Sequence, residues 1–247
     1  MGDKLALVTG SSSGIGRSVA EQLLQRGWRV VGVARRDVDI AHEAYHHVRL
    51  DLAELDAVTD YFENRFAAES GLSGATRVGL VNNAGLLEPV APLHKASADA
   101  LRRAYLVNAV APQWLMGYFL RAAPPVPLRI VNVSSGAATN AYPGWGAYCA
   151  TKAALRMAGE VVGTEAELYA AEGRRDVALV SYSPGVVDTD MQGLIRTKSA
   201  EDFPNVERFI GLHEKGQLVP VDKPSAEICD MLEADGLPMT DERRYGG

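Results

Sequence analysis

Short apolar runs alternating with longer helical patterns place the strongest limit on what this chain can fold into. Nearly every residue within a run is apolar, which is typical of strands buried on both faces of a parallel sheet. The segments between them carry apolar residues at helical spacing. Strands are expected at residues 5–8, 29–34, 47–50, 78–82, 129–134 and 177–183, and helices at 15–26, 54–70, 98–122 and 148–171.

This alternation predicts an α/β fold, a Rossmann-type doubly wound parallel sheet with helices on both faces. No repeat, low-complexity tract or linker interrupts residues 1–247, so a single domain is expected. The long mixed stretch at about 190–220 is expected to form a helical lid over a substrate. After it, the sequence leaves room only for a short and polar last strand.

Charge and composition exclude several classes of protein. A net charge of -6 argues against a surface for nucleic acid or anionic membranes. No apolar run approaches the ~20 residues of a membrane span. Cys149 and Cys229 are far apart, and no His, Cys and Asp residues have the spacing of metal ligands. We therefore expect neither a disulfide framework nor a metal site. A cytoplasmic location is expected.

A glycine-rich turn, Thr-Gly-Ser-Ser-Ser-Gly-Ile-Gly at 9–16, follows the first expected strand and opens the first helix. Glycines let the backbone approach a pyrophosphate, which binds the free N–H groups at the start of a helix. The alternative is a turn without a ligand. The position after the first strand favours a dinucleotide site, with contacts from Gly10, Ser12, Ser13, Gly14, Ile15 and Gly16.

The residues at the end of the second expected strand indicate which dinucleotide the chain binds. Proteins that bind NAD usually carry an acid here for the ribose hydroxyls, whereas an arginine suits the 2′-phosphate of NADP. This chain has Ala34 there, followed by Arg35 and Arg36. Guanidinium groups bind phosphate well, so NADP(H) is expected, with Arg35 as the main contact and Arg36 assisting. The alternative is that both arginines face solvent and Asp37 binds the ribose.

Tyr148 and Lys152 lie four residues apart, on one face of an expected helix, and Ser135 precedes the tyrosine by thirteen residues. A nearby ammonium favours the phenolate and is expected to lower the pKa of Tyr148 towards neutrality. The pair can then exchange a proton with an alcohol or carbonyl oxygen. The alternatives are an exposed Tyr/Lys pair without function, and Ser134 in place of Ser135.

Proline at position 112 affects the helix expected at 98–122. Because proline has no N–H, it leaves the carbonyl of Asn108, four residues earlier, without its helical partner. We expect a kink there and a free carbonyl that can hold a water for proton relay. The alternative is that Pro112 only bends a surface helix.

Further motifs complete a pattern over nearly the whole chain: Asn-Asn-Ala-Gly at 82–85 and Pro-Gly-Val-Val-Asp-Thr at 184–189. Together they resemble the short-chain dehydrogenase/reductase family. The resemblance implies that Tyr148 is the catalytic acid/base, that Lys152 lowers its pKa and holds the nicotinamide ribose, and that Ser135 polarises the substrate oxygen. Asn108 would anchor the relay water. Further cofactor contacts would come from Asp51, Leu52, Asn83, Ala84, Gly85, Pro184, Gly185, Val187 and Thr189.

The loops at 83–90, 145–148 and 187–192 resemble the branch of that family that contains the sepiapterin and benzil reductases. The resemblance implies an NADPH-dependent carbonyl reductase acting on a ketone, with a vicinal dicarbonyl compound favoured. The alternatives are a 3-oxoacyl or general ketone reductase, and a non-catalytic dinucleotide sensor, whose usual mark is loss of the tyrosine or lysine. Walls of the substrate site are expected from Leu86, Tyr142, Trp145 and Met191, each of which could instead be core or a subunit contact.

The helix expected at 148–171 has two apolar stripes. One contains Leu155 and Val162, and the other contains Met157, Val161 and Leu168. A helix that covers a sheet needs only one stripe. The second one predicts a partner and resembles the family's four-helix interface, so a symmetric homo-oligomer is expected, a dimer before a tetramer.

Overall fold

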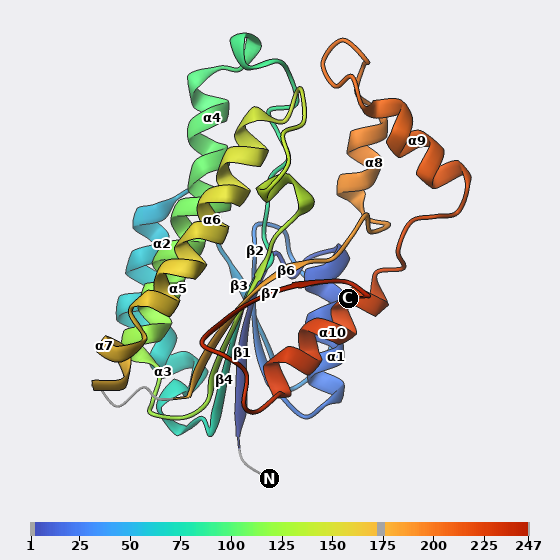
Figure 1. Ribbon diagram of the computed structural model, residues 1–247. Helices are drawn as coiled ribbons and strands as arrows, with labels where there is room; N and C mark the ends of the chain where they lie inside the picture. Colours follow the sequence, from blue (N-terminus) through green and yellow to red (C-terminus); the bar gives the residue numbers. More distant parts are fainter. Residues whose placement is uncertain (1–2, 172–175, 247) are drawn as a thin grey trace.

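The computed structural model describes residues 3–171 and 176–246 and contains a seven-stranded sheet in the order β3-β2-β1-β4-β5-β6-β7 (Figure 1). Every neighbouring pair is parallel, which confirms the predicted fold class. The strands are β1 (Lys4–Thr9), β2 (Arg29–Ala34), β3 (Tyr45–Arg49), β4 (Arg77–Asn82), β5 (Leu128–Val133), β6 (Val177–Ser183) and β7 (Thr240–Arg244).

Helices cover both faces of the sheet, with α1 and α10 on one side and α2 to α6 on the other (Figure 1). Helices α8 and α9 stand apart from both layers, above the carboxyl ends of the strands. The bounds are α1 (Gly14–Gln25), α2 (Leu55–Tyr61), α3 (Ala67–Ser70), α4 (Ala98–Tyr105), α5 (Ala111–Ala122), α6 (Gly146–Thr164), α7 (Ala166–Ala171), α8 (Asp190–Arg196), α9 (Val206–Glu214) and α10 (Asp222–Glu233).

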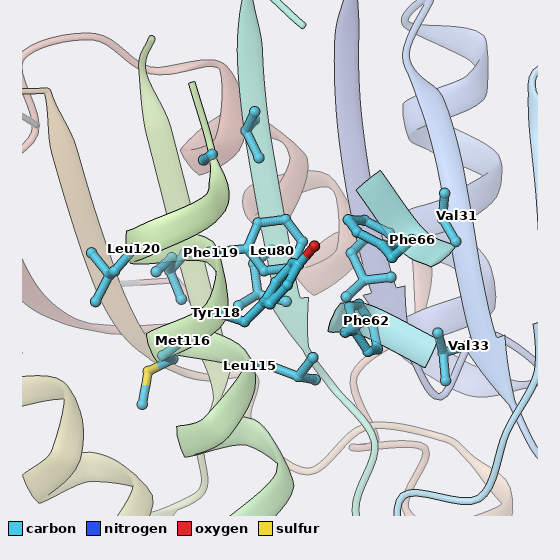
Figure 2. Packing of buried hydrophobic residues seen from close by; sticks show 14 of the residues in the cluster. Val31, Val33, Phe62, Phe66, Leu80, Leu115, Met116, Tyr118, Phe119 and Leu120 are labelled. Atoms are coloured by element: carbon cyan, nitrogen blue, oxygen red, sulfur yellow. The ribbon is translucent and has the colours of Figure 1, made fainter. Parts of the chain in front are cut away.

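Alternate residues of the central strands enter two separate cores. In β1, Leu5 and Leu7 face the core beneath α2 to α6, whereas Ala6 and Val8 face the core beneath α1 and α10. This is the period of two that a strand imposes on its side chains, and it explains why all residues from Leu5 to Val8 are apolar. Figure 2 shows the first core, where the rings of Phe62 and Phe66 lie 4.8 Å apart.

The expected strands agree with the structure to within two residues, and the helices differ more. The strand expected at 47–50 begins at Tyr45, because backbone pairing with β2 continues through polar residues that the hydrophobic pattern passes over. The helix expected at 54–70 is interrupted by a π-helical turn, Phe62–Phe66. The helix expected at 98–122 is interrupted by another, Leu106–Val110, directly before α5. An interruption next to Pro112 was predicted, and such turns bend helices.

The surface of α6 bears on the predicted assembly. Leu155 and Val162 are buried against the sheet, while Met157 is 54% exposed and Val161 is 43% exposed. The helix expected at 148–171 is divided into α6 and α7, so Leu168, at 64% exposure, lies in α7. Tyr105, at the end of α4, is another large exposed residue. One stripe therefore covers the sheet and the other faces outward, as the prediction of a partner requires. Along residues 3–171 and 176–246, no helix combines the length and apolar character needed to cross a bilayer.

Candidate active site

A cavity of about 840 Å³ opens at the carboxyl ends of the strands, which is where doubly wound sheets bind ligands. On the sheet side its wall comes from the turns that follow β1 to β6. On the other side it comes from α8 and α9. Of the residues predicted to bind cofactor or substrate or to act in catalysis, all line this cavity except Gly16 and Asn108. Within the described ranges, no group of three or more His, Cys, Asp or Glu side chains is arranged to hold a metal ion.

Close backbone contacts fix the glycine-rich turn. Gly10 and Gly14 have φ of 71° and 54°, values that favour glycine. A Cβ at Gly16 would lie 2.3 Å from Asn83 Nδ2 and 2.4 Å from the carbonyl oxygen of Gly10. Gly16 thus lies behind the turn and lets α1 approach the segment after β4. Its contribution is to packing, and the cavity wall itself comes from its neighbours.

Thr9 joins the ends of β1 and β4, a role that sequence reasoning missed. Its hydroxyl donates to the carbonyl of Val81 at 3.2 Å and accepts from the N–H groups of Asn83 at 3.0 Å and Ala84 at 3.1 Å. Asn83 Nδ2 donates in turn to the carbonyl of Thr9 at 2.9 Å. These bonds hold two of the predicted motifs in a fixed relation. The sequence feature that could have revealed this role is the threonine directly before Gly10.

The two arginines after β2 differ in their contacts. Arg36 donates to the hydroxyls of Ser13 at 2.9 Å and Ser12 at 3.3 Å, so it lies over the turn. Arg35 lines the cavity, and its guanidinium has neither a hydrogen bond nor an ion pair within the described residues. Asp37, the alternative ribose ligand, lies outside the wall, 3.7 Å from Arg49. The residues present therefore fit a dinucleotide that carries a further phosphate.

Tyr148 and Lys152 lie on the first turns of α6 and are both buried, at 7% and 4% exposure. Ser135 follows β5 and caps a short 3₁₀ turn, where its hydroxyl accepts from the N–H of Ala137 at 3.2 Å. Burial raises the pKa of Tyr148 to about 12, although a hydrogen bond with Ser135 acts to lower it. Burial also lowers the pKa of Lys152 to about 8.

The prediction that Lys152 lowers the pKa of Tyr148 is wrong for this structure. Lys152 Nζ donates to the carbonyl of Val133 at 2.7 Å and lies 5.7 Å from the centroid of the tyrosine ring. The ammonium is thus held at a backbone oxygen, and with a pKa of about 8 it stays mostly charged at neutral pH. Desolvation of the phenol then outweighs any attraction, so Tyr148 is protonated at neutral pH.

Asn108 lies in the π-helical turn and is 1% exposed. Its Oδ1 accepts from the N–H of Leu86 at 2.7 Å, and its Nδ2 donates to the carbonyl of Leu86 at 2.7 Å and to Thr151 Oγ1 at 3.2 Å. A Cβ at Gly85 would lie 3.7 Å from both Asn108 Oδ1 and Lys152 Nζ. Asn108 therefore stands behind the wall, close to Lys152. The relay water on its carbonyl stays a prediction.

The loop after β6 reaches across to the glycine-rich turn. Gly185 has a φ of 81°, and Val187 pairs with Val219 in an isolated parallel bridge. A Cβ at Gly14 would lie 3.2 Å from the methyl of Thr189. The two motif loops, one after β1 and one after β6, thus approach each other at one end of the cavity.

Of the four predicted substrate residues, Tyr142, Trp145 and Met191 belong to or pack against an aromatic cluster shared with α8 and α9, whereas Leu86 packs against the core beneath α2 to α6. The ring of Trp145 stacks on Phe203 with centroids 4.6 Å apart, lies 5.4 Å from Phe209 and meets Tyr148 edge to face at 5.6 Å. Tyr142 lies 5.1 Å from Trp145. Sequence reasoning missed Asn140, between β5 and α6, and several wall residues of α8, α9 and the end of the chain, where no motif has a fixed spacing: Gln192, Arg208, Phe209, Arg244 and Tyr245.

Comparison with known proteins gives a consistent result. A family model described as short chain dehydrogenase matches residues 4–200. Benzil reductase ((S)-benzoin forming) of Bacillus subtilis is 36% identical over 234 residues, which cover 93% of each chain. Sepiapterin reductase of Xenopus tropicalis is 30% identical over 98% of this chain and 95% of its own. A crystal structure of a short-chain dehydrogenase/reductase from Saccharomyces cerevisiae superposes with a TM-score of 0.81 at 27% identity, covering 99% of this chain and 96% of that one.

Proposed function

The chain belongs to the short-chain dehydrogenase family, and on that premise we propose that it is an NADPH-dependent carbonyl reductase whose favoured substrate is a ketone with a second carbonyl beside it. One observation carries the proposal: a single cavity extends from Arg35, after β2, to Tyr148 and Ser135, beside β5. Strands β2 and β5 are three strand spacings apart in the sheet, roughly 14 Å. That span suits an extended dinucleotide with its nicotinamide near Tyr148.

The residues around Tyr148 suit the reductive direction. A nicotinamide cofactor supplies the hydride when bound. Tyr148, whose pKa burial raises to about 12, keeps its proton at neutral pH and can donate it to the oxygen of a carbonyl under reduction. Ser135 offers a second hydrogen bond to that oxygen. Lys152, with a pKa lowered by burial to about 8, can return a proton to the phenol, and a water held on the carbonyl of Asn108 would link Lys152 to solvent.

The preference for NADPH rests on Arg35. Replacing Arg35 with alanine is expected to raise the KM for NADPH by at least about tenfold and to change that for NADH little, because a charge-assisted contact to phosphate is lost. Arg49→Ala, outside the cavity wall, is the control. An equal rise for both nucleotides would mean that Arg35 does not bind the 2′-phosphate.

The substrate class rests on the relatives and on the apolar, aromatic wall beside Tyr148. The test follows NADPH oxidation with benzil, 1-phenyl-1,2-propanedione, sepiapterin, a simple ketone and a 3-oxoacyl thioester. The vicinal dicarbonyl compounds should have the highest kcat/KM. A faster 3-oxoacyl thioester or simple ketone favours the alternative reductase, and tight NADPH binding without any turnover favours a sensor.

We further propose a cytoplasmic, single-domain protein that forms a homodimer through the exposed stripe of α6, with residues 190–220 acting as its substrate lid. Light scattering should give a dimeric mass that falls to that of a monomer in Met157→Glu, because a charge would then occupy the apolar stripe. A monomeric mass for the unaltered protein would contradict the dimer.

A further inference from the structure

The wall of the cavity carries a charge opposite to that of the whole molecule. The chain has a net charge of -6. Two of the acids in the wall are paired, Asp51 with Arg103 at 2.6 Å and Glu88 with Lys198 at 3.3 Å. The basic residues of the wall are Arg35, Arg36, Lys152, Arg208 and Arg244, and its acidic residues are Asp51, Glu88 and Asp190.

Arg208, on α9, is a basic residue that the lid helices contribute to this wall. Within residues 3–171 and 176–246 its guanidinium makes no hydrogen bond or ion pair, and its contact is with the ring of Phe209, at 5.8 Å from the centroid. Most arginines of the chain have a carboxylate within 4.0 Å, as Arg17, Arg26 and Arg103 do. An arginine in a cavity wall without such a partner is free to bind an anion.

Ring contacts place Arg208 at the Tyr148 end of the cavity. Phe209, which the guanidinium of Arg208 contacts, lies 5.4 Å from Trp145, and Trp145 lies 5.6 Å from Tyr148. Arg244, in contrast, pairs in register with Ser183, beside the loop expected to hold the nicotinamide. Arg208 is therefore the better placed of the two to meet a substrate whose carbonyl lies at Tyr148.

A second polar group beneath the lid also lacks a partner. Gln192, on α8, is 2% exposed and lines the cavity, yet its Oε1 has no hydrogen bond to any described residue. Its Nε2 lies 3.5 Å from the carbonyl of Phe209, the neighbour of Arg208. The side-chain oxygen of Gln192 is thus left without a partner among the described residues, as expected of a cavity wall that completes its hydrogen bonds with a ligand.

We propose that Arg208 binds a carboxylate of the substrate, so that the preferred carbonyl compounds carry a negative charge remote from the reacting carbonyl. This inference rests on the proposed reductase function and narrows its substrate class. The carbonyl lies at Tyr148 and Ser135, an apolar or aromatic middle packs on Trp145, and the carboxylate meets Arg208. Asp190, an acid of the wall without an ion pair in the described part of the chain, begins α8, where the helix N-terminus stabilises its charge.

The test uses a matched pair, 1-(4-carboxyphenyl)-1,2-propanedione and its methyl ester. The unaltered enzyme should have a kcat/KM about tenfold higher for the acid than for the ester, the expected worth of a charge-assisted pair. Arg208→Gln should remove the preference by lowering kcat/KM for the acid alone, and Arg208→Lys should keep part of it. Lys215→Gln, just after α9 and outside the wall, should keep all of it.

Equal kcat/KM for acid and ester in the unaltered enzyme would overturn the inference, as would loss of the preference in Arg244→Gln with Arg208→Gln unaffected. If the protein reduces neither compound, the proposed function fails instead. Thermal shifts of the NADPH-loaded protein with benzoate and benzamide then decide the inference separately. Stabilisation by benzoate over benzamide that Arg208→Gln abolishes supports it, and equal shifts refute it.

Discussion

The two ends of the cavity are held together by different kinds of contact. At the cofactor end, the turn after β1 is fixed to the neighbouring strand β2 by a bond between backbone groups, in which the N–H of Gly10 donates to the carbonyl of Val33 at 2.8 Å. At the substrate end, the segment that joins α8 to α9 is held by side chains, through the stacking of Trp145 on Phe203 and the ion pair of Lys95 with Glu201 at 2.6 Å. Backbone contacts persist through most substitutions, whereas side-chain contacts change with them. The first end therefore keeps its chemistry while the second can vary its ligand.

The largest test of this difference compares two tyrosines of the wall. Tyr148→Phe should lower kcat by about a thousandfold, because general acid catalysis contributes that order of magnitude, while NADPH affinity stays unchanged. Tyr142→Phe, nearer the lid, should change KM by a few-fold at most. Steady-state kinetics and NADPH binding measure both. Similar losses of kcat in the two variants would contradict the idea that one end of the cavity keeps its chemistry while the other varies its ligand.

Two glycines sharpen the comparison through stability. Gly16→Ala should lower the free energy of unfolding by about 2–3 kcal/mol, because the new Cβ meets backbone that cannot move away. It should also weaken NADPH binding. Gly193→Ala, in α8, meets nothing within 4 Å and should raise that free energy by up to about 1 kcal/mol. Urea unfolding checks both, and an unaffected Gly16→Ala would show that the turn can adjust after all.

The smallest expected change in the free energy of unfolding concerns Lys152 and Lys198. In the folded protein burial lowers the pKa of Lys152 to about 8, below its unfolded value of 10.5, so the unfolded chain binds more protons between these pH values. The lysine therefore destabilises the fold below pH 8, and its cost disappears as the pH rises towards 10.5. Lys152→Met should abolish activity yet raise the free energy of unfolding at neutral pH by roughly 2 kcal/mol.

The stability gain of Lys152→Met should shrink when urea unfolding is repeated near the upper end of this pH window. Lys198→Met, which removes the lid's pair with Glu88 at 3.3 Å, should change stability by less than about 1 kcal/mol with little dependence on pH. A Lys152→Met gain that is constant over the window would mean that the ammonium is not desolvated in the fold.

The fold class and the place of the glycine-rich turn and Arg35 in one cavity wall were predictable, because these residues lie at fixed distances along the chain. Gly10, Gly14 and Arg35 follow predicted strands directly, so the carboxyl ends of parallel strands bring them together. Residues of the lid were not predictable in this way. Gln192 and Arg208 reach the wall through the packing of α8 and α9, which no motif spacing encodes.

The pKa of Tyr148 was mispredicted for a related physical reason. The spacing of Tyr148 and Lys152 sets their place on one helix face, but it says nothing of burial or of competing acceptors. In the fold, the carbonyl of Val133 takes the ammonium, and desolvation controls both groups. In contrast, the interruption of the helix before Pro112 was predictable, because a missing N–H is a property of the residue itself.

The stacking of Trp145 on Phe203 gives the molecule an intrinsic optical reporter. Of the three tryptophans, Trp28 is buried with the core beneath α1 and α10, and Trp114 packs against the core shown in Figure 2. Trp145 is the one whose ring contacts the lid. Any movement of α9 would bring water to this indole and shift its fluorescence to longer wavelength, while the emission of the other two stays constant. Ligand binding beneath the lid can thus be followed without a label.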